Sequence, residues 1–181
     1  SKVFDHAYFV NNYGWFEGST ITANGDVRAN GDMYLDSGCK VNREVYAAQF
    51  EKMAAGWQDG VEELRKAVEK APSERRDEVR ADLRYVRAAG ITFRSVANQA
   101  RFVIARDALA KAGLPQPERQ RLKKEIRQVL ESEIALAREQ YALVCEDSRI
   151  GFEPSCQYFY MPLDLLEKVV NCRWLQGLYA D

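Results

Sequence analysis

Apolar residues recur every three to four positions over most of this chain, which is the spacing of one face of an α-helix. The pattern predicts three long helices, over residues 44 to about 70, about 74 to 111 and about 118 to 146. A fourth, shorter helix is expected from Pro162, because proline suits the first turn of a helix. Short connections make consecutive helices antiparallel neighbours. We therefore expect a mainly α fold, an antiparallel up-down bundle of three to four helices.

Each predicted helix has its own set of inward side chains. The first set is Tyr46, Phe50, Met53, Trp57, Val61, Leu64 and Val68. The second is Val79, Leu83, Val86, Gly90, Phe93, Ala97, Ala100 and Ile104. The third is Leu122, Ile126, Val129, Leu130, Ile134, Ala137, Tyr141 and Val144, and the fourth is Leu165, Leu166, Val169, Val170, Trp174 and Leu175. Ser73 is the expected N-cap of the second helix, whose later half is apolar on more than one side and should contact two neighbours or another domain.

Residues 1–43 follow a different pattern, in which Ala-Asn-Gly-Asp at 23–26 recurs at 29–32. Apolar side chains keep the same six-residue spacing: Ile21, Val27, Met33, Cys39 and Val45. Asn-Gly pairs favour tight turns, so each unit predicts a short strand followed by a turn. We expect a small β-repeat segment, solenoid-like or built from hairpins, capped by the aromatic stretch 7–16. The chain then divides into a β-repeat segment, 1–43, and a helical domain, 44–181.

Metal binding is a weaker interpretation of the same segment. A calcium loop would use Asn24, Asp26, Asn30, Asp32 and Asp36. Their order lacks the ligand sequence and the terminal Glu of an EF-hand, which favours turns instead. The four cysteines have no C-x-x-C spacing and His6 is the only histidine, which argues against zinc. No metal and no cofactor is predicted.

Composition and charge narrow the class of partner. The chain has 181 residues and a formal net charge of −1, so no overall positive field attracts nucleic acid or an anionic membrane. No apolar run approaches the roughly 20 residues that span a bilayer. The chain begins with Ser1 and no leader precedes it, which suggests a segment of a longer protein and leaves its targeting unread.

The segment 147–172 gathers ionisable and aromatic side chains between two predicted helices. Our candidate residues for a carbohydrate or domain contact are Asp147, Arg149, Glu153, Tyr158 and Tyr160. Carboxylates and Arg hold sugar hydroxyls, and aromatic rings cover the apolar faces of sugars. The alternative is structural: Asp147 and Arg149 form an ion pair, and the aromatic side chains close the end of the bundle. Two carboxylates in a loop define no acid/base geometry, so no catalytic residue is predicted.

Other polar groups have structural interpretations as well. Arg94, Asn98 and Arg101 lie along one stripe of the second helix, where they could bind a ligand or satisfy buried polar groups. Basic residues between 119 and 127 alternate with Glu118 and Glu125, which is typical of a solvated helix face. No phosphate-binding glycine loop or nucleophile elbow occurs. Cys145 and Cys156 flank the loop and could form a disulfide, although buried free thiols are the favoured interpretation.

The helical region resembles the α-helical C-terminal region of bacterial glycoside hydrolases related to α-glucuronidases. The similar stretches are FEKMAAGW at 50–57, FRSVANQARF at 93–102, EIALA at 133–137, DSRIGFE at 147–153 and YFYMPLDLLEKVVNC at 158–172. In such enzymes the acid and base lie on an upstream barrel domain. The resemblance therefore implies a non-catalytic accessory domain that packs against a catalytic barrel or mediates dimerisation, with a polysaccharide as a further partner.

The stretch AYFVNNYGWFEGSTITANGDV, at 7–27, resembles pilin-associated bacterial surface proteins with short β-repeats. This second resemblance implies an alternative function, that of a surface or envelope interaction protein with a β-repeat adaptor and a helical spacer. Both resemblances imply a bacterial, secreted or cell-envelope protein. A chain that fuses two modules would account for both.

Overall fold

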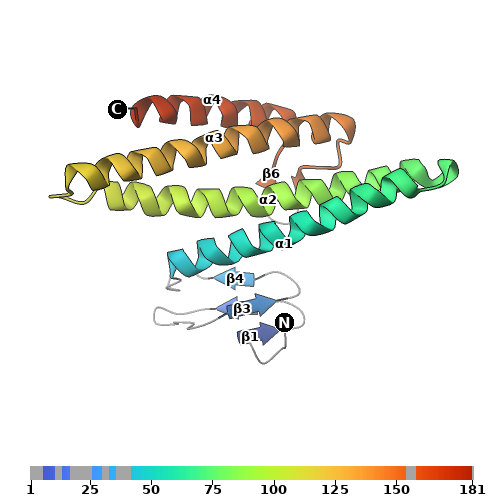
Figure 1. Ribbon diagram of the computed structural model, residues 1–181, viewed down its shortest axis with the longest axis horizontal. Helices are drawn as coiled ribbons and strands as arrows, with labels where there is room; N and C mark the ends of the chain where they lie inside the picture. The colour runs from blue at the N-terminus through green and yellow to red at the C-terminus, as the bar shows by residue number, and fades with distance from the viewer. Residues whose placement is uncertain are drawn as a thin grey trace.

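Four helices dominate the computed structural model, which describes residues 6–10, 14–16, 26–29, 33–35, 42–153 and 158–180. They are α1 (Arg43–Lys70), α2 (Arg76–Leu109), α3 (Gln116–Glu146) and α4 (Pro162–Leu178). The helices run alternately in opposite directions and lie side by side in chain order (Figure 1). The mainly helical, antiparallel fold is therefore confirmed. None of the described helices combines the length and apolarity needed to cross a membrane.

Short strand pairs flank the helices. β1 (His6–Val10) pairs in parallel with β3 (Asp26–Ala29), and β2 (Gly14–Phe16) pairs in parallel with β4 (Met33–Leu35). Between α3 and α4, β5 (Phe152–Glu153) pairs in antiparallel fashion with β6 (Tyr158–Phe159). Most of the Asn-Gly turns and of the calcium-loop candidates lie outside the described residues. The six-residue β-repeat therefore stays a prediction.

Local chemistry explains where two of the helices begin. Asn42 begins α1, because its side-chain oxygen accepts hydrogen bonds from the backbone N–H groups of Glu44 and Val45, at 3.0 and 3.2 Å. Pro162 opens α4, and the Asp164 carboxylate accepts from the Met161 N–H at 3.1 Å. The expected cap at Ser73 is wrong. Ser73 instead starts a one-turn 3₁₀ helix, η2 (Ser73–Arg75), and α2 begins without a side-chain cap.

Because α2 packs between α1 and α3, its most buried residues differ from most of the inward side chains that the sequence predicted. The predicted residues Val86, Gly90 and Phe93 face α1, where Trp57 donates its indole N–H to the Val86 carbonyl at 2.7 Å. A Cβ on Gly90 would lie 2.9 Å from the Trp57 ring, so glycine is required for this close contact. Of the predicted set, Ala97 is among the most buried residues on α2, and the others are Ala88, Ile91, Ser95 and Ala105. The prediction that α2 contacts two neighbours is confirmed.

On α1 the predicted inward face is confirmed at Val61 but wrong at several other positions. Tyr46, Met53 and Trp57 are each more than a third exposed, whereas Ala47, Ala54 and Val61 are buried. The buried residues lie seven positions apart, and two of them are alanines. Small side chains at the contact allow two helix backbones to approach closely, which puts the larger side chains at its margins.

The core lies between α2, α3 and α4, in two apolar clusters. The inward face predicted for α3 is largely confirmed, since Leu122, Ile126, Leu130, Ile134 and Val144 are all buried. It also contains two polar residues that the apolar pattern did not predict, Glu133 and Gln140. On α4 the predicted face divides in two, because Leu165 is buried while Leu166, Val170 and Trp174 are exposed.

Candidate functional site

Asp147 and Arg149 form an ion pair at the end of α3, as the structural interpretation predicted. The Asp147 carboxylate accepts two hydrogen bonds from the Arg149 guanidinium, at 2.9 and 2.7 Å, and one from the Arg149 backbone N–H at 3.1 Å. The Tyr85 hydroxyl donates a further bond at 2.9 Å. The Asp147 side chain is 8% exposed, whereas that of Arg149 is 75% exposed and lies over the Tyr85 ring. We call Asp147 and Arg149 the end pair.

These contacts change how the groups titrate. The Arg149 hydrogen bonds, joined by the one from Tyr85, hold the pKa of Asp147 well below its usual range. The bond to Asp147 raises the pKa of Tyr85 in turn, because ionising the phenol would remove the donor. Asp147 is therefore a permanent carboxylate whose oxygens are already engaged. Its chemistry is that of a structural anion.

A sharp turn follows the end pair at Gly151. Gly151 has a φ of 91°, and a Cβ there would lie 2.5 Å from the Tyr160 carbonyl oxygen. Its own carbonyl accepts from the Tyr160 N–H at 2.6 Å. Glu153 and Tyr158 lie opposite each other in the register of β5 and β6. Tyr160 packs against the core beside Lys168. The side chains of Glu153 and Tyr158 lie outside the described part of the structure, so a cluster of all five candidates stays a prediction.

A second carboxylate and cation meet inside the molecule. Lys168 on α4 lies 2.6 Å from the Glu133 carboxylate on α3, with side chains 21% and 5% exposed. The Lys168 ammonium also donates to the Ser95 hydroxyl at 2.9 Å and to the Tyr160 hydroxyl at 3.1 Å. Ser95 and Asn98 on α2 donate to the two oxygens of Glu133, at 2.9 and 2.8 Å. We call Glu133 and Lys168 the interior pair.

Serine, lysine and tyrosine at hydrogen-bond distance are also the groups of some nucleophilic active sites, in which lysine acts as a base. Burial alone would lower the pKa of Lys168, but the charge and hydrogen bond of Glu133, together with Tyr160, outweigh burial and raise it. The ammonium is therefore charged and cannot take a proton from Ser95, which is itself 1% exposed. The interior pair joins three helices and is closed to a substrate.

The polar stripe predicted on α2 has three different roles. Arg101 binds the Glu51 carboxylate through two nitrogens, at 2.7 and 2.9 Å, and also contacts Glu44. These contacts raise the pKa of Arg101 and lower that of Glu51. The Asn98 side-chain amide donates hydrogen bonds to the Glu133 carboxylate and to the Ser132 hydroxyl. Arg94 has no hydrogen bond or ion pair among the described residues, and it borders a hollow in the surface.

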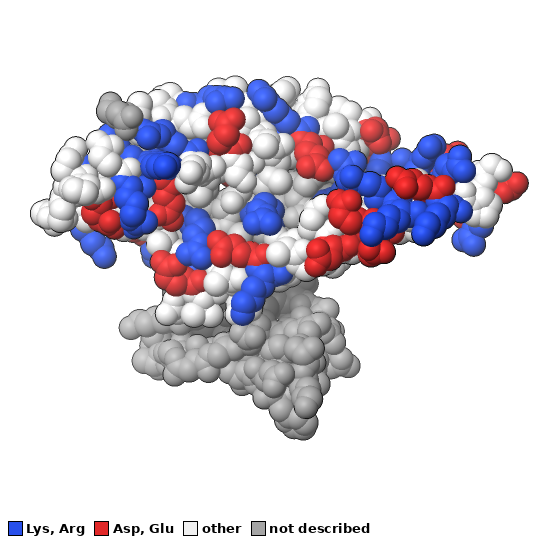
Figure 2. Space-filling view, in the orientation of Figure 1, with Lys and Arg blue, Asp and Glu red and all other residues white. Residues whose placement is uncertain are grey.

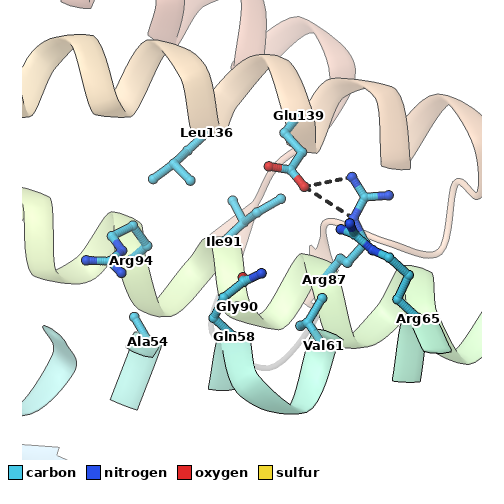
Figure 3. Close-up of a pocket in the computed structure, with 10 residues that line it drawn as sticks. All are labelled: Ala54, Gln58, Val61, Arg65, Arg87, Gly90, Ile91, Arg94, Leu136 and Glu139. Atoms are coloured by element: carbon cyan, nitrogen blue, oxygen red, sulfur yellow. Dashed lines mark hydrogen bonds and ion pairs between the residues drawn. The ribbon is translucent and has the colours of Figure 1, made fainter. Parts of the chain in front are cut away.

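That hollow, of about 240 Å³, lies between α1, α2 and α3. Figure 3 shows Arg94 toward one end, Arg65 and Arg87 toward the other, and Gln58 between them. Ile91 and Leu136 lie over its middle, and the buried residues Ala54 and Val61 line its α1 side. Glu139 is the one carboxylate in the lining, and it accepts from Arg87 at 2.7 and 3.2 Å. We call this the arginine hollow.

The outer face of α4 carries the most exposed large apolar side chains in the described part of the chain. Its side chains and their exposed fractions are Leu163 74%, Leu166 51%, Val170 66%, Trp174 65% and Leu178 57%. An apolar groove of about 200 Å³ runs beside it, between α3 and α4, and is lined by Tyr141 and Leu166 among others. Sequence periodicity placed several of these residues inward, because it cannot separate two apolar faces of one helix.

Charges elsewhere are mixed. Figure 2 shows basic and acidic side chains interspersed over one side of the helical domain. The basic run of α3 follows the predicted pattern, since Arg121 binds both Glu118 and Glu125.

No group of His, Cys, Asp and Glu within the described ranges could hold a metal ion. Cys145 and Cys172 carry free thiols, and burial raises the pKa of Cys172. Cys156 lies outside the described residues.

No family of proteins, no curated protein and no solved structure matches this chain. The resemblances to glycoside hydrolases and to pilin-associated proteins therefore stay predictions.

Proposed function

We propose that this chain is a non-catalytic helical module of a carbohydrate-active enzyme, which packs against another folded body through the outer face of α4. The exposure of that face is the observation that carries the proposal. Leu163, Val170 and Trp174 are each about two thirds exposed or more, while Leu165 and Cys172 on the opposite side of the same helix are buried. Contiguous exposed apolar surface of this kind marks sites of protein interaction. The partner is a catalytic barrel or a second copy of the chain.

The state of the buried charges supports the non-catalytic part of the proposal. Glu133 and Asp147 are both held by a cation and by hydroxyl or amide donors. A glycosidase needs two carboxylates facing one sugar, with the acid kept protonated near neutral pH. The end pair holds its carboxylate ionised instead. The link to carbohydrates rests on the resemblance of residues 46–175 to the helical regions of glycoside hydrolases.

The β-repeat of residues 1–43 belongs to the proposal as a small cap on this module. Parallel pairing of β1 with β3 and of β2 with β4 supports a solenoid-like arrangement, in which successive passes of the chain stack on each other. In this proposal, the loop residues that contact a polysaccharide are the exposed Arg149, together with Glu153 and Tyr158. Titration with xylan and glucuronoxylan oligosaccharides tests this part. No binding, or binding unchanged in Arg149→Ala, would remove it.

Two neighbouring substitutions on α4 test the interaction face. Val170→Asp places a charge within the apolar face, and Asn171→Asp places the same charge on the adjacent exposed residue. Sedimentation equilibrium of the full chain should show self-association that Val170→Asp weakens by tenfold or more and Asn171→Asp leaves unchanged. If the partner is a barrel, the wild-type chain should be monomeric. It should then bind a hydrophobic dye at the outer face of α4, and Val170→Asp should abolish that binding. A monomer that binds no dye would refute the proposal, as would turnover of glycosides by the isolated chain.

A further inference from the structure

The arginine hollow has more cationic than anionic groups around it. Arg65, Arg87 and Arg94 line it, and Glu139 is the only carboxylate among its lining residues. Glu139 is committed to Arg87. The lining thus has an excess of two positive charges, three guanidinium groups less one carboxylate.

Carboxylates just outside the hollow do little to neutralise this excess. Arg65 approaches Glu62 only at 3.6 Å, with both side chains about half exposed, a geometry worth little in water. Glu51 is close enough for Arg94 to lower its pKa, but Arg101 occupies both of its oxygens. Arg94 is half-buried and keeps its donors unused among the described residues. A partly buried guanidinium without a partner is a ready donor to a carboxylate.

The positive groups stand at the two ends of the hollow, and its middle is apolar (Figure 3). Arg87 and Arg94 are seven residues apart on α2. At 1.5 Å per residue their backbones are about 10.5 Å apart along the helix axis. Between them lie Ile91 and Leu136, with the Gln58 amide as the only uncharged polar side chain of the lining. A matching ligand has an anionic group at each end and a short apolar chain between.

We infer that the arginine hollow binds a short aliphatic dicarboxylate of about the length of glutarate or adipate. One carboxylate pairs with Arg94, and the other pairs with Arg65 and the exposed edge of Arg87. The methylene chain lies against Ile91 and Leu136. This site is separate from the outer face of α4, so it stands or falls independently of the proposed interaction surface.

Calorimetric titration of the full chain with adipate tests the inference. We expect a dissociation constant of about 1 mM or below at low ionic strength, and weaker binding as salt is added. Hexanoate has the same chain length but one carboxylate, so it should bind at least tenfold more weakly. No heat with adipate up to about 10 mM, or equal binding of hexanoate, would overturn the inference.

Substitutions locate the binding. Arg94→Met keeps the aliphatic stem and removes the unpaired guanidinium, so adipate affinity should fall at least tenfold, and Arg65→Met should weaken it as well. The matched control is Arg80→Met, because Arg80 lies on the same helix outside the hollow and contacts Asp77 at 3.3 Å. Circular dichroism confirms that each variant is folded. Adipate affinity unchanged in Arg94→Met, or equally reduced in Arg80→Met, would exclude the hollow as the site.

Discussion

The interior pair and the end pair have the same chemistry in different surroundings. Each joins a buried carboxylate to a cation at almost the same distance, 2.6 Å for Glu133 and Lys168 and 2.7 Å for Asp147 and Arg149. Each also has a tyrosine hydroxyl within hydrogen-bond distance, Tyr160 in the interior and Tyr85 at the end of α3. They differ in the cation. That of the interior pair is 21% exposed and that of the end pair 75%.

This difference decides what each pair does for the fold. The Arg149 guanidinium keeps most of its hydration, so pairing with Asp147 gains little beyond fixing the turn after α3. Lys168 has lost most of its water, and Glu133, Ser95 and Tyr160 replace it. Removing one member of such a pair leaves an uncompensated charge in the core. The interior pair is therefore an obligatory unit that fixes α4 against α2 and α3.

Replacing Lys168 gives the largest effect we expect. Lys168→Met leaves the Glu133 carboxylate in the core without its cation, at a cost of about 3–5 kcal/mol in the free energy of unfolding. Urea denaturation at pH 7, followed by circular dichroism, measures it. The matched variant of the end pair, Arg149→Met, should lose far less, because the lost contact is solvated. Equal losses in the two variants would contradict the comparison.

The double variant Glu133→Leu/Lys168→Met separates pairing from packing. It removes both charges together, so it should recover most of the stability that Lys168→Met loses. If the double variant is as unstable as Lys168→Met, the loss arises from packing of the lysine stem, and the obligatory role of the pair is wrong.

An intermediate effect is expected at Gly151, which connects the two regions. Alanine there meets both an unfavourable positive φ and a contact of 2.5 Å with the Tyr160 carbonyl oxygen, and Tyr160 leads to the interior pair. We expect Gly151→Ala to cost about 3 kcal/mol. Gly113→Ala is the control, since Gly113 has a φ of 72° but no atom within 4 Å of a Cβ, and should cost only about 1 kcal/mol. Thermal denaturation compares the two, and equal losses would exclude the contact with Tyr160.

Sequence periodicity predicted the helices well because each has at least one apolar face. The bounds of α1 and α3 lie within two residues of those expected. Periodicity did not predict which face is buried where a helix is apolar on two sides. On α1 the alanines are buried and Trp57 lies at the margin, because backbone proximity, rather than side-chain size, decides the contact.

The candidate site was predictable only in its local part. Asp147 and Arg149 are two residues apart, so sequence alone could suggest their ion pair. Glu133 and Lys168 are brought together by tertiary packing, and no spacing rule connects them. One signal was available: Glu133 occupies an inward position of a helix between Leu130 and Ala137, and a buried carboxylate requires a partner. Arg65, Arg87 and Arg94 likewise line one hollow only because α1 packs against α2.

The smallest effect distinguishes the pairs by pH. Because the pKa of Asp147 is lower in the folded chain than in the unfolded one, its contribution is present above the unfolded value, near 3.9, and is lost as the pH falls through the folded value. The pKa of Lys168 is higher in the folded chain, so its contribution is present below about 10.4 and is lost as the pH rises through the folded value. The end pair should therefore lose its contribution to the free energy of unfolding in acid, and the interior pair should lose its contribution in alkali.

Urea denaturation of the wild type, Asp147→Asn and Lys168→Met from about pH 2 to 11 tests both signs. Wild type and Asp147→Asn should differ modestly at pH 7, and the difference should shrink steadily as the pH falls below about 4, because the unfolded chain then takes up a proton that folded Asp147 still refuses. Wild type and Lys168→Met should converge only above about pH 10. A difference between wild type and Asp147→Asn that persists unchanged at pH 2 would mean that Asp147 acts through its hydrogen-bond geometry rather than its charge. The end pair would then stabilise the fold through hydrogen-bond geometry and the interior pair through charge, so the two pairs would differ in mechanism as well as in exposure.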